Sequence, residues 1–328
     1  MKTKRLVVAA AFLFSVLAVS SCQTPYHEQE ERYVFVATNI NLPYWQEAQA
    51  GLTDSAKQLG VKAELTGPEK FDPQAQVQAF QKVVESKPSG ILVSVSRPEL
   101  LQDAINSAIA QGIPVIAVDS DAPNSKRVMF VGTDNFRAGQ ESGRRIASLL
   151  KGQGQIVLIT IPGQLNLEER ARGLNDALKS TSIKTLQTID DNGDPRVAND
   201  AISALLAKKT KIDGIVCLEA SGGSGAAEAL HRLDAKIPVV GFDKDPETLD
   251  WIDRDGITAT VTQKPYVMAY YALKFADDLH HNAVHDFKDW RTAPVSPMPA
   301  WVDTGTAVVD KSNVKVFRDA LAAHPKPL

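Results

Sequence analysis

Cysteine is scarce in this chain of 328 residues, which contains only Cys22 and Cys217. Two cysteines cannot form the disulfide framework that stabilises many small secreted domains, so stability must come from a buried core. A chain of this length with 44% hydrophobic residues can bury one or two such cores. Cys217 lies in the apolar stretch Gly214–Leu218, which predicts a buried and inert thiol.

The sequence also lacks an excess of basic residues and the common catalytic motifs. A net charge of −3 gives no electrostatic footprint for nucleic acid. No Gly-x-Ser-x-Gly elbow, zinc motif or Cys–His pair is found, so we expect no catalytic residue, no cofactor and no metal site. His231, His280 and His281 are expected on helices, facing solvent. The acids Asp119 and Asp243 leave a glycosidase open as an alternative.

Long hydrophobic runs are absent apart from Leu6–Val19, which has 14 residues and is too short for a membrane span. With the basic segment Met1–Arg5 before it, this run predicts a secretory signal over residues 1–21. Small residues precede Cys22, which predicts lipidation there, although an ordinary signal with a chance cysteine is the alternative. Residues 22–32 then form a tether, and the protein is expected in the cell envelope, facing the periplasm or the exterior.

From residue 32 onward, short apolar runs rich in β-branched residues alternate with amphipathic stretches. This alternation predicts an α/β fold with parallel sheets covered by helices on both faces. Three Asp-Pro pairs, at residues 72, 194 and 245, predict capped helix starts. The expected strands are Tyr33–Ala37, Val61–Leu65, Gly90–Val95, Pro114–Val118, Val128–Val131, Gln155–Thr160, Lys184–Ile189, Gly214–Leu218, Pro238–Gly241 and Ile257–Val261.

Polar and aromatic residues follow several expected strands in the first half, where ligands of open parallel sheets bind. Thr38 offers a hydrogen bond after the first strand, and Tyr44 and Trp45 begin the next helix. Aromatic faces suit sugar rings, although Trp45 can instead pack under the loop. Asp119 follows the fourth strand and is expected to accept hydrogen bonds from two hydroxyls.

The second half repeats this arrangement. Asp243 follows its strand as Asp119 does, and Gln263 follows another. One arginine of the pair Arg170 and Arg172 can reach a cleft. Glu219 opens a glycine-rich turn, Ala220–Gly225, which is either a plain turn or a ligand-contacting loop.

Together these residues resemble the ribose-binding-protein-like family of periplasmic sugar-binding proteins, the type I solute-binding fold, over about Arg32 to Phe317. Their order and spacing carry the resemblance more than any one motif. The motifs are Pro43-Tyr44-Trp45, Ile113–Asp119, Gly132–Asn135, Glu169–Gly173, Ile237–Asp243 and Gln263.

The resemblance implies two doubly wound parallel-sheet lobes joined by a hinge that the chain crosses three times, near 133–135, 262–264 and 289–295. The N-terminal lobe is then 33–133 plus 264–290, and the C-terminal lobe 134–263 plus 291–328. The implied ligand-binding residues are Thr38, Tyr44, Trp45, Asp119, Thr133, Arg170, Glu219, Asp243 and Gln263.

Three departures from the family pattern bear on the ligand. Ser120 stands where ribose binders have an arginine, Glu219 where asparagine is common, and Gly193 where a third aromatic often stacks. The pocket can therefore favour a ligand with more hydroxyls or a cationic group.

The expected function is that of a monomeric, lipid-anchored binding protein of an ABC-type sugar importer, which closes on a small sugar and docks on a membrane permease. A sensor that presents its ligand to a receptor kinase or chemoreceptor is the main alternative. Some repressors share this fold, but here the signal and lipobox occupy the place of their helix-turn-helix.

Overall fold

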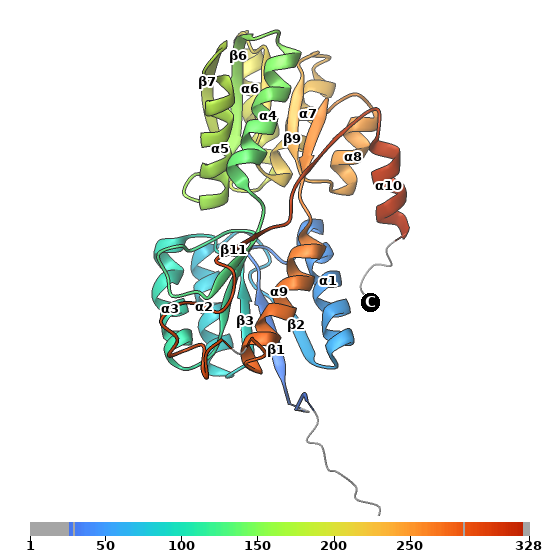
Figure 1. Ribbon diagram of the computed structural model, residues 1–328. Helices are drawn as coiled ribbons and strands as arrows, with labels where there is room; N and C mark the ends of the chain where they lie inside the picture. Colours follow the sequence, from blue (N-terminus) through green and yellow to red (C-terminus); the bar gives the residue numbers. More distant parts are fainter. Residues whose placement is uncertain (1–25, 29, 285, 324–328) are drawn as a thin grey trace, which may run out of the picture.

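The computed structural model describes residues 26–28, 30–284 and 286–323, and shows two α/β lobes, one above the other in Figure 1. The expected signal, Cys22 and residues 23–25 and 29 of the expected tether lie outside these residues. Each lobe contains one six-stranded sheet. Within the described residues, no helix has the length and apolar character that a membrane crossing needs.

The first sheet has the strand order β11-β5-β4-β3-β1-β2, and all its neighbours pair in parallel. Its strands are β1 Arg32–Val36, β2 Lys62–Thr66, β3 Gly90–Val93, β4 Val115–Val118, β5 Met129–Gly132 and β11 Trp301–Asp303. The helices of this lobe are α1 Pro43–Leu59, α2 Pro73–Glu85, α3 Pro98–Ala110 and α9 Pro265–His280.

The second sheet has the order β12-β10-β9-β8-β6-β7, in which β12 pairs antiparallel with β10. Its strands are β6 Gln153–Thr160, β7 Ser182–Asp190, β8 Gly214–Cys217, β9 Val239–Phe242, β10 Ala259–Thr262 and β12 Ala307–Asp310. The helices of this lobe are α4 Asn135–Leu149, α5 Leu165–Leu178, α6 Pro195–Ala207, α7 Ala220–Arg232, α8 Pro246–Asp253 and α10 Val314–Ala323.

Burial explains why the strands read as continuous apolar runs. Successive residues of β1 point to opposite faces of the sheet. Tyr33 and Phe35 belong to the core that includes residues of α1 and α9, whereas Val34 and Val36 belong to the core that includes residues of α2 and α3. Both faces are thus covered, as the apolar sequence predicts, and all ten expected strands are present to within two residues at each end.

Two of the three Asp-Pro pairs cap helices as expected. Asp72 accepts from the Ala75 amide at 3.0 Å, and Asp194 accepts from the Arg196 amide at 2.9 Å. Asp245 precedes α8, but its side chain makes no capping hydrogen bond. Its carboxyl is held near the lobe interface, where burial and the nearby Asp243 raise its pKa to about 8.

The chain passes between the lobes at three places. It leaves the first lobe between β5 and α4, and it returns between β10 and α9. The third crossing is not at residues 289–295, because β11 pairs in parallel with β5 of the first sheet. The crossing instead joins β11 to β12, so the predicted boundary at residue 291 is wrong and residues 301–303 belong to the first sheet. Two strands of three and four residues, with prolines before them, gave too little periodicity to be predicted.

The expected glycine-rich turn at Ala220–Gly225 is the beginning of helix α7. Glycine is needed here for close packing, because a Cβ on Gly225 would lie 2.0 Å from the carbonyl oxygen of Pro195 in α6. The plain turn is therefore wrong, whereas contact with the cavity is made at the beginning of this helix, where Ala220 lines it.

A candidate ligand site between the lobes

A cavity lies between the two lobes, where the carboxyl ends of their strands face each other. Its empty volume is about 540 Å³, open solvent included. Eight of the nine residues predicted to bind ligand line it: Thr38, Tyr44, Trp45, Asp119, Arg170, Glu219, Asp243 and Gln263.

Asp119 is the acid of the first lobe. Its backbone has φ of 67°, a left-handed conformation that aspartate tolerates better than most residues, and its amide donates to the Val131 carbonyl at 3.0 Å. The carboxylate accepts from the Tyr44 hydroxyl at 2.7 Å and from the Ser94 hydroxyl at 3.1 Å. Burial raises the pKa of Asp119, while the positive charge of Arg170 and these two hydrogen bonds oppose the rise.

The aromatic pair both packs in the core and lines the cavity. The rings of Tyr44 and Trp45 meet edge to face at 5.0 Å, and Trp45 makes a second such contact with Phe35 at 5.7 Å. Both side chains belong to the core cluster of the first lobe. The two roles that the sequence left open for Trp45 are therefore compatible, and the pair forms a rigid wall.

Arg170, in α5, faces the cavity from the second lobe and is only 1% exposed. Its Nε donates to Asn135 Oδ1 at 2.9 Å, its Nη1 donates to the Leu218 carbonyl at 2.7 Å, and its guanidinium lies 4.4 Å from the centre of the Phe242 ring. Among the described residues, its Nη2 has no hydrogen-bond partner. A buried charged donor without a partner is costly, so this atom is the strongest sign of an absent acceptor.

Arg172 has the opposite character, although it lies two residues further along the same helix. Its side chain is 67% exposed and pairs with Glu169. The choice between the two arginines, which their order in the sequence leaves open, thus follows from which face of α5 each occupies.

Asp243 is the acid of the second lobe and repeats the backbone of Asp119. Its φ is also 67°, and its amide donates to the Val261 carbonyl at 2.8 Å. Its carboxylate accepts from Gln263 Nε2 at 2.9 Å. Burial raises the pKa of Asp243 to about 6, opposed by Arg170 and Gln263 and reinforced by the negative charges of Asp119 and Glu219.

Thr133 is buried but does not line the cavity. Its hydroxyl donates to Gln263 Oε1 at 3.0 Å, and the amide nitrogen of Gln263 is then directed to Asp243. Thr133 and Gln263 lie in the first two crossings between the lobes, so the hydrogen-bonded series Thr133–Gln263–Asp243 connects the hinge to the cavity.

Glu219 lines the cavity, yet its carboxylate is occupied by the N-terminus of α7. It accepts from the Ser221 amide at 2.6 Å and from the Gly222 amide. The same carboxylate lies beside Asp191, whose pKa is raised by burial and then by the charge of Glu219. A negative charge at this helix terminus is favoured by the helix dipole.

Sequence reasoning missed several residues of the cavity wall. Gln164 and Asn166 lie at the beginning of α5, and Asn39 directly follows Thr38. Phe71 reaches the cavity from the segment after β2 and packs on a core cluster of the second lobe. Phe71 therefore supplies an aromatic side chain to the cavity wall, whereas Gly193 supplies none. Like the predicted site residues, these residues follow strands. No repeated sequence pattern around them indicates that they face the cavity.

The lobes also touch beside the cavity. Lys244 of the second lobe forms an ion pair with Glu47 of α1. Arg97 of the first lobe lies against Gly163, such that a Cβ on that glycine would be 3.1 Å from the guanidinium carbon. The cavity is therefore bounded by direct contacts between the lobes.

Comparison with known proteins identifies the fold and then the family. The structure resembles a sugar-binding protein of a sugar ABC transporter from Bacillus halodurans, with a TM-score of 0.79, 33% identity and coverage of 88% of this chain and 100% of that one. It also resembles an arabinose binding protein from Geobacillus stearothermophilus, with a TM-score of 0.74, 34% identity and coverage of 88% and 99%.

Two sequence comparisons agree. The ribose import binding protein of Bacillus subtilis is 26% identical over 246 residues, which are 74% of this chain and 80% of the relative. The model of the periplasmic binding protein domain matches residues 33–282. The chain therefore belongs to the periplasmic binding protein family.

Proposed function

We propose that this protein binds a small sugar between its two lobes and delivers it to the permease of an ABC importer. The relatives described above bind ribose or arabinose or serve a sugar transporter, as their names state. The free Nη2 of Arg170 is the observation that carries the proposal, because it needs an acceptor such as a sugar hydroxyl or ring oxygen.

The walls of the cavity suit such a ligand. Tyr44 and Trp45 offer aromatic edges and faces to the C–H groups of a sugar ring. Asp119 and Asp243 supply two ionisable acceptors from opposite lobes, and hydroxyl groups donate strongly to ionised acceptors. Thr38, Gln263 and Glu219 complete the predicted set. Thr133 acts by orienting Gln263 and does not touch the ligand.

Binding would stabilise the closed arrangement of the lobes. A sugar held by one lobe gains the contacts of the other lobe only on closure, so its affinity for the closed state is higher. The ion pair of Lys244 with Glu47 joins the two lobes and would add to these contacts. The closed surface then docks on the permease, and lipidation at Cys22 keeps the monomer at the membrane facing the periplasm or the exterior.

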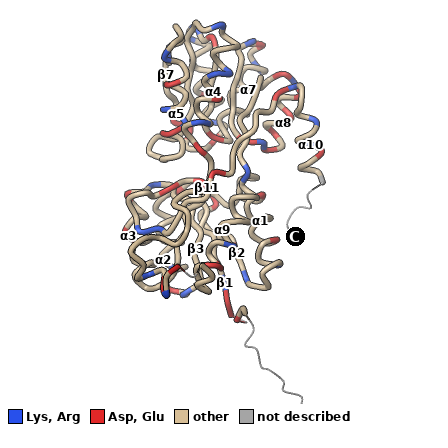
Figure 2. Tube along the Cα trace, in the orientation of Figure 1, with Lys and Arg blue, Asp and Glu red and all other residues tan. Residues whose placement is uncertain are grey.

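A cationic metabolite is the second candidate ligand. The cavity wall contains the carboxylates of Asp119, Asp243 and Glu219 but only one guanidinium. The carboxylate of Glu219 is satisfied by backbone amides, and the raised pKa of Asp243 lowers its negative charge near pH 6. The charge balance of the cavity wall therefore favours a neutral sugar. Outside the cavity, acidic and basic residues are distributed over both lobes (Figure 2).

A thermal-shift screen of the purified full chain against pentoses, hexoses, polyols and small cationic metabolites tests the proposal. One sugar at 100 times its dissociation constant is expected to stabilise the protein by about 2.7 kcal/mol. Arg170→Ala should abolish the shift, and Arg172→Ala, on the same helix but exposed, is the matched control. A shift by a cationic compound and by no sugar would contradict the proposal.

Two further measurements separate the remaining alternatives. Stimulation of the ATPase activity of a co-expressed permease by the sugar-loaded protein supports import. Ligand-dependent binding to a receptor kinase, without such stimulation, supports the sensor. Glycoside hydrolysis that is lost in Asp119→Asn would support an enzyme.

A further inference from the structure

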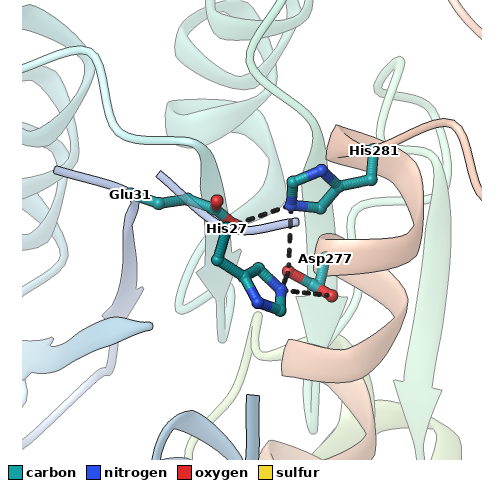
Figure 3. A group of neighbouring side chains, drawn as sticks. All are labelled: His27, Glu31, Asp277 and His281. Atoms are coloured by element: carbon teal, nitrogen blue, oxygen red, sulfur yellow. Dashed lines mark hydrogen bonds and ion pairs between the residues drawn. The ribbon is translucent and has the colours of Figure 1, made fainter. Parts of the chain in front are cut away.

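A second cluster of functional side chains lies at the end of the first lobe away from the cavity. It contains His27, Glu31, Asp277 and His281, whose candidate ligand atoms all lie within 4.8 Å of one another (Figure 3). Two of them precede β1, and two lie at the end of α9, about 250 residues away in the sequence. Sequence analysis expected no metal site here and expected His281 to face solvent. The i, i+4 spacing of Asp277 and His281 nevertheless brings both side chains to one face of a helix.

Three of the six separations between the candidate ligand atoms are near those found around a single small cation. His27 Nε2 lies 3.1 Å from Asp277 Oδ1, His281 Nε2 lies 3.0 Å from Glu31 Oε1, and His281 Nε2 lies 3.6 Å from Asp277 Oδ1. Zinc binds imidazole nitrogen and carboxylate oxygen at about 2.0–2.1 Å, which places neighbouring tetrahedral ligands about 3.3 Å apart. These three separations are close to that value, and the remaining pairs lie within 4.8 Å.

The surrounding residues hold the carboxylates in place. The Tyr33 hydroxyl lies 2.8 Å from Glu31 Oε1 and 3.0 Å from Asp277 Oδ1, and can donate to either. The Glu28 amide donates to Glu31 Oε2 at 3.1 Å. Outer hydrogen bonds of this kind orient the ligands of metal sites. The cluster also lies at the C-terminus of α9, where the helix dipole favours a cation.

Charge gives a second reason for a cation. Glu31 is 3% exposed and Asp277 is 2% exposed, so two carboxylates lie buried side by side. Buried charges require compensation. With neutral histidines the pair would keep two negative charges, which a divalent ion neutralises. The alternative is a pair of protonated histidines without metal, and the two differ in whether the protein binds an ion.

We propose that His27, Glu31, Asp277 and His281 bind one divalent transition-metal ion, with zinc as the best match to two imidazoles and two carboxylates. The ion would connect the segment before β1 to the end of α9. Because the cavity residues follow β1 and the cluster precedes it, the two sites lie at opposite ends of this five-residue strand, about 17 Å long at 3.3–3.4 Å per residue. The bound ion therefore fixes the segment from His27 to Glu31 to the first lobe and leaves the cavity free to open and close.

Calorimetric titration with Zn²⁺ tests this site. The full chain is purified in detergent, stripped of metal with a chelator, and titrated in parallel with variants. We expect one ion per chain, and an affinity at least 100-fold weaker in the double variant His27→Gln, His281→Gln. His231→Gln is the matched control, because His231 lies on α7 of the other lobe and should leave the affinity unchanged. Bound Co²⁺ should show the visible spectrum of a tetrahedral site.

Tyr33→Phe removes only the hydroxyl that contacts both carboxylates, and should weaken Zn²⁺ binding by about 10- to 100-fold. Circular dichroism confirms that each variant is folded. Sugar-induced thermal shifts should be unchanged in the histidine variants, which separates this site from the ligand cavity. Absence of Zn²⁺ binding by the full chain, or equal binding by the double variant, overturns the proposal.

Discussion

The two lobes use the same backbone device to present an acid and then surround that acid differently. Asp119 and Asp243 each follow a central strand, each have φ of 67°, and each donate an amide hydrogen bond to the neighbouring strand. In the first lobe, Tyr44 and Ser94 of the same lobe bind the carboxylate. In the second lobe, the partner is Gln263 at the hinge.

This difference indicates a division of labour. The acid of the first lobe is held by its own lobe, so that lobe presents an aromatic wall and a fixed acceptor whether open or closed. The second lobe contains the unpartnered donor of Arg170 and an acid connected to the hinge. The first lobe is therefore expected to receive the ligand, and the second to respond to it.

The largest expected effect comes from removing the charged donor of the second lobe. Arg170→Ala should weaken sugar binding by about 30- to 5,000-fold, because truncating a buried charged partner costs about 2–5 kcal/mol. Titration calorimetry measures the loss. Arg172→Ala should bind as the unmodified protein does, and equal losses in both variants would refute the role of Arg170.

The two acids should differ when each is made neutral. Asp119→Asn and Asp243→Asn should each weaken binding by roughly 10- to 100-fold, since a hydrogen bond to a charged group contributes about 1.5–3 kcal/mol. Asparagine also tolerates the left-handed backbone at both positions. The loss of affinity near pH 6, where protonation of Asp243 removes an acceptor, should be reduced in Asp243→Asn and retained in Asp119→Asn. Asp234→Asn, another left-handed aspartate that is exposed, is the control.

Asp243→Asn should increase the stability of the ligand-free protein, although it weakens sugar binding. The pKa of Asp243 is raised in the folded state, so its contribution to stability is greatest below about pH 4 and is lost as the pH rises through about 6. Asp243→Asn should therefore increase the free energy of unfolding at pH 7.5 by up to about 3 kcal/mol, and this gain should disappear near pH 4. Urea unfolding at both pH values measures it. A variant that is less stable than the unmodified protein at pH 7.5 would contradict the proposed cost of burying this acid.

The smallest effect is expected at the ion pair between the lobes. Lys244→Ala should increase the rate of sugar dissociation by about two- to fivefold, because partly exposed pairs contribute up to about 1 kcal/mol. Stopped-flow fluorescence of Trp45 in the cavity wall can follow the release. Lys236→Ala, an exposed lysine of the same lobe, should leave the rate unchanged.

The sequence predicted the repeated part of the fold because repetition is visible in it. Ten strands and the cavity-lining acids follow from apolar runs that end in polar residues, and the family follows from the resemblance of the ordered motifs. The short strands β11 and β12 lack such runs, so the third crossing was misplaced. The glycines of α7 indicated a turn, whereas Gly225 allows close packing against α6.

Contacts between distant segments were the other limit. Phe71 and Gly193 both line the cavity, but they are far apart in the sequence and no local pattern connects them. The orientation of Thr133 likewise depends on Gln263, which is 130 residues further along the chain. The cluster of His27 and His281 depends on a fold that brings the beginning of β1 and the end of α9 together. Such pairs arise from topology, which a single sequence does not display.

The central claim, that the lobes bind a sugar between them through Arg170 and the paired acids, is tested most directly by calorimetric titration. The sugar identified in the screen is titrated into the unmodified protein, Arg170→Ala and Arg172→Ala under the same conditions. The account predicts one sugar per chain, a large loss of affinity in Arg170→Ala and none in Arg172→Ala. Sugar binding that survives Arg170→Ala unchanged would show that the ligand lies elsewhere.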